Sequence, residues 1–175
     1  MSSPIPGPTE SPRPSDDRSA VLLVNLGTPD APTAAATRRY LAEFLADPRV
    51  IELPRLVWLP LLYGLILPLR AGRSARAYRK IWLPDGSPLR VHSQRLAGEL
   101  QRVLRAGGIE LPVRLAMRYG APSIADVLQQ LRAEGLGRLL VLPLYPQYSA
   151  TTTASVFDAV GRELLRQRRV PELRT

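Results

Sequence analysis

Short apolar runs alternate with helical patterns along most of the chain, and this alternation limits the fold more than any other feature. We expect strands at residues 21–26, 112–117 and 138–144, and the approach to a further strand from residue 171 onward. Short, nearly continuous apolar runs of this kind are typical of strands that are buried on both faces. The sequence therefore predicts an α/β fold: a three-layer, Rossmann-like parallel sheet with helices on both sides.

Helical patterns occupy the gaps between these runs. One helix is expected to open at Asp30-Ala-Pro32, because proline suits the first turn of a helix. A second is expected over residues 93–106. Ser123 and Asp126 form a capping box that predicts the start of a third, and residues 151–168 predict a fourth.

The carboxyl ends of the strands are where ligands of parallel sheets usually bind. In this chain those ends are residues 25–28, 117–120 and 145–149. No G-x-G-x-x-G and no Walker motif is present, so a nucleotide-binding reading lacks its usual support. The chemistry is therefore sought at these three chain segments.

The charge of the chain indicates an anionic partner but does not say which kind of anion it is. The formal net charge is +9, and because Lys80 is the only lysine, the positive charge is nearly all arginine. Nucleic acid, anionic lipid and a small polyanion all remain open. The absence of cysteine excludes disulfides and thiolate metal sites within this chain. Residues 1–19 are rich in proline and serine and lack the apolar core of a secretory signal, which indicates a disordered leader and a cytoplasmic protein.

An uncharged apolar segment stands out at residues 56–69. As a helix it would span about 21 Å, short of the ~30 Å hydrocarbon core, and Pro60 and Pro68 would interrupt it. A core helix, an apolar lip around a pocket over residues 50–70, and a membrane-touching surface stay open as interpretations. Trp58 and Tyr63 favour an irregular lip.

Arginines follow this segment directly, at three-residue spacing: Arg70, Arg73, Arg76 and Arg79. On a helix they would lie along one drifting face. They are either a solvated face or a set of anchors for acidic groups. An amphiphilic ligand with an apolar body and carboxylate arms would suit the order of lip and arginines, and so would an anionic membrane.

Four blocks at the expected strand ends resemble the ferrochelatases. They are Leu23-Val-Asn-Leu-Gly-Thr-Pro29, then Ala77-Tyr-Arg-Lys-Ile81 with Gly86-Ser-Pro-Leu89, then Met117-Arg-Tyr-Gly120, and finally Leu142-Pro-Leu-Tyr-Pro-Gln-Tyr-Ser149 with Thr151–Thr153. The resemblance runs from about Val21 to the carboxyl terminus, with order and spacing preserved. It implies a chelatase-like fold of two similar domains facing each other across a cleft. Residues 20–175 would be only the first of these domains, and truncated.

The resemblance implies a function as well: insertion of ferrous iron into protoporphyrin IX to give protohaem, the last step of haem biosynthesis. Fe²⁺ would be a substrate, and no organic cofactor would be needed. The porphyrin-binding residues carried over by the resemblance are Leu26, Tyr78, Arg79, Ser87, Arg118, Tyr119, Tyr145 and Tyr148. For Tyr145 and Tyr148, packing in the core stands beside ligand contact as an interpretation.

The sequence also departs from the family. The histidine and glutamate that insert the metal would lie beyond Thr175, so no catalytic residue and no metal ligand is expected in this chain. The only histidine, His92, lies in the wrong place and lacks companion ligands. Ala150 stands where some members carry an iron–sulfur cysteine, so that ligand is absent here.

Rival functions remain beside this one. The first is a non-catalytic half-domain that binds porphyrin or haem, and the second is a related chelatase for another metal. The third, a nucleic-acid-binding domain, rests on charge alone and lacks a recognisable binding fold, so we expect no nucleic acid partner. The expected location is the cytoplasm, with peripheral contact to the anionic inner membrane.

Overall fold

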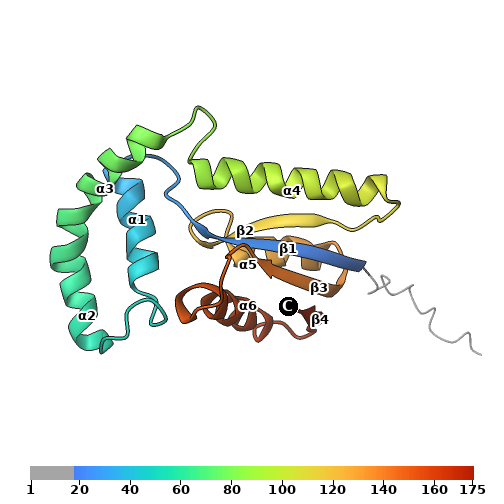
Figure 1. Ribbon diagram of the computed structural model, residues 1–175. Coiled ribbons are helices and arrows are strands. Elements are labelled where there is room, and N and C mark those ends of the chain that lie inside the picture. Colours follow the sequence, from blue (N-terminus) through green and yellow to red (C-terminus); the bar gives the residue numbers. More distant parts are fainter. Residues whose placement is uncertain (1–17) are drawn as a thin grey trace, which may run out of the picture.

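A single parallel sheet organises the molecule, and the computed structural model describes it over residues 18–175 (Figure 1). The four strands lie in the order β2–β1–β3–β4 and all pair in parallel. They are β1 (Arg18–Gly27), β2 (Val113–Tyr119), β3 (Leu136–Pro143) and β4 (Glu172–Arg174). The predicted α/β class is confirmed. The proposed leader lies outside the described residues except for Arg18 and Ser19, which belong to β1.

Helices cover the sheet on both faces, which is the three-layer arrangement that the sequence predicts. Helix α4 (Pro88–Ala106) packs on one face, whereas α5 (Ile124–Ala133) and α6 (Ser155–Leu164) pack on the other (Figure 1). Strand β1 contributes to the hydrophobic core on each face of the sheet, because its alternate side chains point to opposite faces. Leu22 and Val24 meet α5 and α6, and Val21 and Leu23 meet α4.

A helical arm stands at the end of the sheet where β1 finishes (Figure 1). It consists of α1 (Ala34–Leu45), α2 (Arg55–Leu61), the π-helical turn η1 (Leu62–Ile66) and α3 (Leu67–Ile81). Leu62 and Leu67 are fully buried against Tyr40, Leu41 and Tyr119, which fixes the arm to the sheet. The arm therefore lies beside the edge at which ligands of parallel sheets bind.

The prolines of the apolar segment do not interrupt it, contrary to our expectation. Helix runs from Arg55 to Ile81, with Pro60 inside α2 and Pro68 in the first turn of α3. The π-helical turn lies between them, and an extra residue per turn lets a helix absorb groups that proline leaves without a partner. The segment is thus one continuous helix with a π-helical turn in it, so the expected irregularity is wrong, whereas its role as an apolar lip stays a prediction.

Three predicted helix bounds also shift. α1 begins after Thr33, whose side chain accepts a hydrogen bond from the Ala36 N–H at 3.3 Å, so Pro32 precedes the helix instead of opening it. α4 begins at Pro88 rather than Ser93. The predicted helix over 151–168 is a π-helical turn, η2 (Ala150–Ala154), followed by the shorter α6. The Ser123 cap of α5 and the start of β4 agree with the sequence pattern.

Candidate functional site

A buried carboxylate joins the arm to the sheet. Asp47 follows α1, is only 6% exposed, and its Oδ2 accepts a hydrogen bond from the Tyr119 hydroxyl at 2.8 Å and from the Ser155 hydroxyl at 2.9 Å. The Arg118 guanidinium also donates to Oδ2, and the Arg49 N–H donates to Oδ1 at 2.7 Å. One carboxylate thus ties together the end of α1, the end of β2 and the start of α6.

The same network pairs the positive charge of Arg118 with Asp47 and provides hydrogen-bond acceptors for its guanidinium. Its Nε donates to the Ser155 carbonyl oxygen at 2.9 Å and to the Ser155 Oγ at 2.7 Å, and its guanidinium lies 4.4 Å from the centre of the Tyr119 ring. An arginine at a strand end is costly to bury without a partner, and Asp47 is that partner. The structure therefore places Arg118 and Tyr119 within an internal network, with Tyr119 only 1% exposed.

Electrostatics within the network favour the ionised carboxylate. Burial by itself raises the pKa of Asp47, but hydrogen bonds from the Arg49 N–H, Tyr119 and Ser155, together with the charge of Arg118, outweigh it and hold this pKa below its usual value. Burial also raises the pKa of Tyr119. At neutral pH the network is an ion pair supported by neutral hydroxyls.

Two further contacts fasten the arm to the sheet. The Gly120 N–H donates to the Glu43 carboxylate at 2.8 Å, linking α1 to the end of β2. The Arg49 guanidinium pairs with the Asp158 carboxylate of α6 through two hydrogen bonds, at 2.7 and 3.1 Å. Together with Asp47 these contacts fix the angle at which the arm stands over the sheet edge.

Tyrosines gather where the arm meets this edge. Tyr40 of α1 is buried close to Tyr78, Tyr119 and Tyr145, and burial followed by these neighbours raises its pKa. Tyr145 follows β3 and packs against the core under α6, and burial raises its pKa to about 12. Its hydroxyl is buried and has no hydrogen-bond partner. Among the predicted porphyrin-binding residues, Tyr78, Tyr119 and Tyr145 therefore all lie close to Tyr40.

Leu26, Tyr78 and Arg79 lie where a ligand at the sheet edge could meet them. Leu26 is half-buried at the end of β1 and packs against the core of the arm. Tyr78 is half-buried on α3 and meets the ring of Trp82 edge-on, with 6.3 Å between ring centres. Arg79 is exposed in the last turn of the same helix.

Ser87 and Tyr148, the other two predicted porphyrin-binding residues, differ sharply in exposure. Ser87 is 2% exposed, and its hydroxyl accepts a hydrogen bond from the Arg90 N–H at 3.3 Å as the N-cap of α4. Tyr148 is 74% exposed in the loop before η2. His92 is exposed on α4. Ser87 thus has a structural use, while its part in porphyrin binding stays a prediction.

The sequence interpretation missed Asp47, Ser155 and Glu43. Asp47 follows the apolar stripe of α1, and a lone carboxylate at that position carries no motif. Its role depends on residues 71 and 108 positions away in the chain, a separation that local patterns cannot reveal. One signal in the sequence could have indicated a carboxylate near this strand end: Arg118 is costly to bury there without an acidic partner.

The outer surface of the arm is apolar. Leu56 is 92% exposed, Leu69 is 67% exposed, and Val57, Tyr63 and Leu65 are also exposed. By length and composition the helical segment Arg55–Ile81 could cross a membrane. Arg70, Arg73, Arg76 and Arg79 are all exposed along α3. Exposed arginines thus follow the exposed apolar surface on one helical segment beside the sheet edge, an order that suits an amphiphilic ligand or a lipid surface. Among residues 18–175, no cluster of three or more His, Cys, Asp or Glu side chains could hold a metal ion.

Comparison with known proteins agrees with this geometry. The sequence model of the ferrochelatase family matches residues 18–175. A ferrochelatase of Herminiimonas arsenicoxydans is 59% identical over 157 residues, which is 90% of this chain and 43% of the relative. A ferrochelatase of Polaromonas sp. strain JS666 is 60% identical over 156 residues, 89% of this chain and 42% of the relative. The chain spans less than half the length of these relatives, and it belongs to the ferrochelatase family.

Proposed function

We propose that this chain is the porphyrin-binding half of a ferrochelatase, which inserts ferrous iron into protoporphyrin IX to give protohaem. One observation carries the proposal. An exposed apolar helix, continued by four exposed arginines, stands at the carboxyl edge of a parallel sheet in a chain of the ferrochelatase family. A flat apolar macrocycle with two carboxylate arms has the shape and charge that this arrangement complements.

The proposed roles follow from where the side chains lie. Leu26 and the apolar side of the arm would contact the macrocycle, while Arg79 would pair with a carboxylate. Tyr78 and Tyr145 would border the ring, and the unpartnered Tyr145 hydroxyl would gain a hydrogen-bond partner there. The Asp47 network would act indirectly, because it positions the arm and the end of β2 rather than reaching the ligand.

If this chain is the porphyrin-binding half, the residues that insert the iron lie outside it. Binding energy from the apolar contacts would favour a bent porphyrin, whose exposed nitrogens accept Fe²⁺ and release two protons. The described residues offer no cluster of metal ligands for delivering that iron. The 175-residue chain should therefore bind porphyrin without metallating it.

The test compares the 175-residue chain with the full-length polypeptide under anaerobic conditions. Protoporphyrin IX binding is followed by its absorbance and fluorescence, and Fe²⁺ insertion by the loss of porphyrin fluorescence. We expect both proteins to bind the porphyrin, and only the full-length polypeptide to insert iron. Lack of porphyrin binding by both proteins would refute the proposal, and so would iron insertion by the short chain at the rate of the long one.

A second candidate function is a half-domain that holds porphyrin or haem without insertion. The exposed apolar side of the arm and the arginines after it suit this candidate equally well, because they would serve porphyrin binding rather than insertion. A related chelatase for another metal is the third candidate. Full-length polypeptide that binds protoporphyrin but inserts neither Fe²⁺, Co²⁺ nor Ni²⁺ would establish the second, and preference for Co²⁺ or Ni²⁺ would establish the third. Coproporphyrin in place of protoporphyrin IX tests the choice of substrate in the same assay.

We also propose that the protein resides in the cytoplasm and touches the anionic inner membrane peripherally. The support is the pairing of exposed apolar side chains with arginines on one helical segment. Cell fractionation tests it: release from the membrane fraction by high salt is expected, and retention until detergent is added would indicate an integral segment instead.

A further inference from the structure

Helix α2 lies at the far end of the arm, where few contacts hold it. It runs beside the carboxyl-terminal part of α1 (Figure 1), and none of its own residues is buried. Leu62, in the π-helical turn that follows, is fully buried, so α2 extends about two turns beyond the nearest buried residue of its own helical segment. The position of α2 therefore depends on contacts that its side chains make with α1.

Trp58 makes the shortest hydrogen bond between these two helices. Its indole N–H donates to the Leu45 carbonyl oxygen at 2.7 Å, and its partly buried ring packs against the core that fixes the arm to the sheet. Trp58 lies four residues before Leu62, so the two side chains lie on the same face of the helical segment. One hydrogen bond and one ring contact thus hold the middle of α2 against α1.

Arg55 makes a second hydrogen bond to the same end of α1. Its guanidinium Nη1 donates to the Ala46 carbonyl oxygen at 3.2 Å in an exposed position. The last carbonyl groups of a helix have no partner within that helix, so side chains that donate to them complete its hydrogen bonding. Two consecutive residues at the end of α1 are therefore bonded to side chains of α2.

The next residue along the chain is Asp47, which bonds in the opposite direction. Its carboxylate accepts hydrogen bonds from Arg118, Tyr119 and Ser155 at the end of the sheet. Residues 45–47 thus contact α2 through two backbone carbonyl groups and the end of β2 through one side chain. Because consecutive Cα atoms are only about 3.8 Å apart, these three residues set the position of α2 relative to the sheet edge.

The π-helical turn η1 limits what the rest of the helical segment can do for α2. Bends in helices occur at π-helical turns and at proline, and here η1 and Pro60 both lie between Trp58 and α3. Helix α3 packs along α1 by contacts of its own, including the fully buried Leu67. Loss of the Trp58 and Arg55 hydrogen bonds should therefore release α2 and leave α3 in place.

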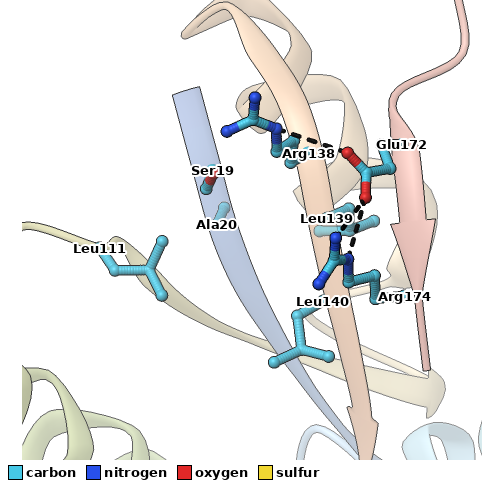
Figure 2. A pocket seen from close by; sticks show the side chains of 8 residues that line it. All are labelled: Ser19, Ala20, Leu111, Arg138, Leu139, Leu140, Glu172 and Arg174. Carbon is cyan, nitrogen blue, oxygen red and sulfur yellow. Dashed lines mark hydrogen bonds and ion pairs between the residues drawn. The ribbon is translucent and has the colours of Figure 1, made fainter. Parts of the chain in front are cut away.

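The hollow at the opposite end of the sheet is a poor alternative place for an apolar ligand with carboxylate arms. It lies near the starts of β1, β3 and β4, where Ser19 is part of its lining. Figure 2 shows the Glu172 carboxylate between two arginines, 3.4 Å from Arg138 and 2.9 Å from Arg174. A ligand carboxylate would have to displace Glu172 from both arginines. The exposed apolar side of α2, with the exposed arginines of α3 after it, suits such a ligand better.

We infer that Trp58, assisted by Arg55, is a positioning residue for porphyrin binding, because its hydrogen bond to the Leu45 carbonyl oxygen keeps α2 on α1 with its apolar side beside the sheet edge. This inference rests on the proposed function. Neither residue is among the porphyrin-binding residues that the family resemblance supplies. If porphyrin binds only molecules in which α2 lies on α1, its apparent affinity falls in proportion to the fraction of such molecules.

The principal test is Trp58→Phe in the full-length polypeptide, because it removes the indole N–H and keeps an aromatic ring. We expect the KM for protoporphyrin IX to rise about five-fold, as the loss of one hydrogen bond typically requires. The kcat of Fe²⁺ insertion should not change, because bound porphyrin holds α2 on α1 equally before and during insertion. A lower kcat at unchanged KM, or no change in either constant, would overturn the inference.

Hydrogen exchange without porphyrin separates positioning from a general loss of stability. In Trp58→Phe the amides of residues 55–61 should exchange about five-fold faster or more, whereas those of α3 and β1 should exchange as in the wild type. Saturating protoporphyrin IX should restore slow exchange at residues 55–61. Faster exchange throughout the protein would mean that Trp58 stabilises the whole fold, which contradicts a positioning role.

Arg55→Met and Arg18→Met provide a second variant and its matched control. Each removes a guanidinium that donates to a carbonyl oxygen at the end of a helix: Ala46 at 3.2 Å for Arg55, and Glu134 after α5 at 3.1 Å for Arg18. Arg18 lies at the start of β1, at the end of the sheet opposite the arm. Arg55→Met should raise the KM for protoporphyrin IX, and Arg18→Met should leave KM and kcat unchanged.

Equal changes in these two variants would assign the effect to charge and overturn the inference. Arg55→Met also keeps the test valid should Trp58→Phe fail to fold. The two proposals fail in different ways. Wild-type full-length polypeptide that does not bind protoporphyrin IX refutes the proposed function. Wild type that binds and metallates it, with Trp58→Phe at the wild-type KM and wild-type exchange rates, refutes only the role of Trp58.

Discussion

At the scale of single residues, Asp47 holds together groups from three distant parts of the chain. Replacing it by asparagine keeps its shape but leaves the Arg118 charge buried without an ionic partner, with only 9% of that side chain exposed. We expect Asp47→Asn to lower the free energy of unfolding by about 3–5 kcal/mol, as when one partner of a buried ion pair is removed. Urea unfolding followed by circular dichroism measures it.

The matched control is Asp158→Asn, which removes the other carboxylate that bonds to the Arg49 segment. That pair is more than one-third exposed on both sides, so its loss should cost far less. If the two substitutions cost the same, the Asp47 network would not be the main attachment of the arm.

Acid should weaken this attachment. The pKa of Asp47 is lower in the folded chain than in the unfolded one, so its contribution to stability is present above the unfolded pKa of about 3.9. That contribution is lost as the pH falls through the folded pKa. The difference in unfolding free energy between the wild type and Asp47→Asn should therefore be largest near pH 7 and narrow below about pH 4. A difference that stays constant down to the acid transition would contradict this.

At the scale of elements, the continuous helical segment Arg55–Ile81 of the arm has an outer side that no described residue covers. Leu56 is its most exposed apolar side chain, and a membrane would bury it. We expect the wild type to float with vesicles containing anionic lipid. Leu56→Glu should reduce the bound fraction about ten-fold, because it removes a leucine that the membrane would bury and adds a charge that anionic lipid repels. Flotation in a density gradient measures it.

The control is Leu165→Glu, which changes an equally exposed leucine at the end of α6, away from the arm. It should bind vesicles as the wild type does. Equal loss in both variants would indicate that net charge alone governs binding, and no loss in either would show that the arm does not touch the lipid.

The elements that the sequence predicts well are those with local signals. Continuous apolar runs identify the strands, and the Ser123–Asp126 box identifies the start of α5, because both depend on neighbouring residues. The continuous helix over Arg55–Ile81 was missed because proline is a strong local signal, and packing of Leu62 and Leu67 overrides it. The motif residues Tyr78, Tyr119 and Tyr145 were predicted by resemblance, but Asp47 and Ser155 could be found only once the fold brought them together.

At the scale of the whole molecule, electrostatic repulsion between copies of the chain opposes their association through exposed apolar surface. The net charge of +9 keeps copies apart at low salt, whereas the exposed apolar outer side of the arm favours association. Raising the ionic strength from 0.01 M to 1 M shortens the screening length from about 30 Å to about 3 Å, which removes most of the repulsion and leaves apolar attraction intact. We therefore expect the chain to sediment as a monomer at low salt and to self-associate at high salt.

Leu56→Glu should reduce the association at high salt, whereas Leu165→Glu should not. Dissociation on adding salt would mean that ion pairs hold the copies together. A monomer at every salt concentration would mean that the apolar side of the arm attracts other copies too weakly for association.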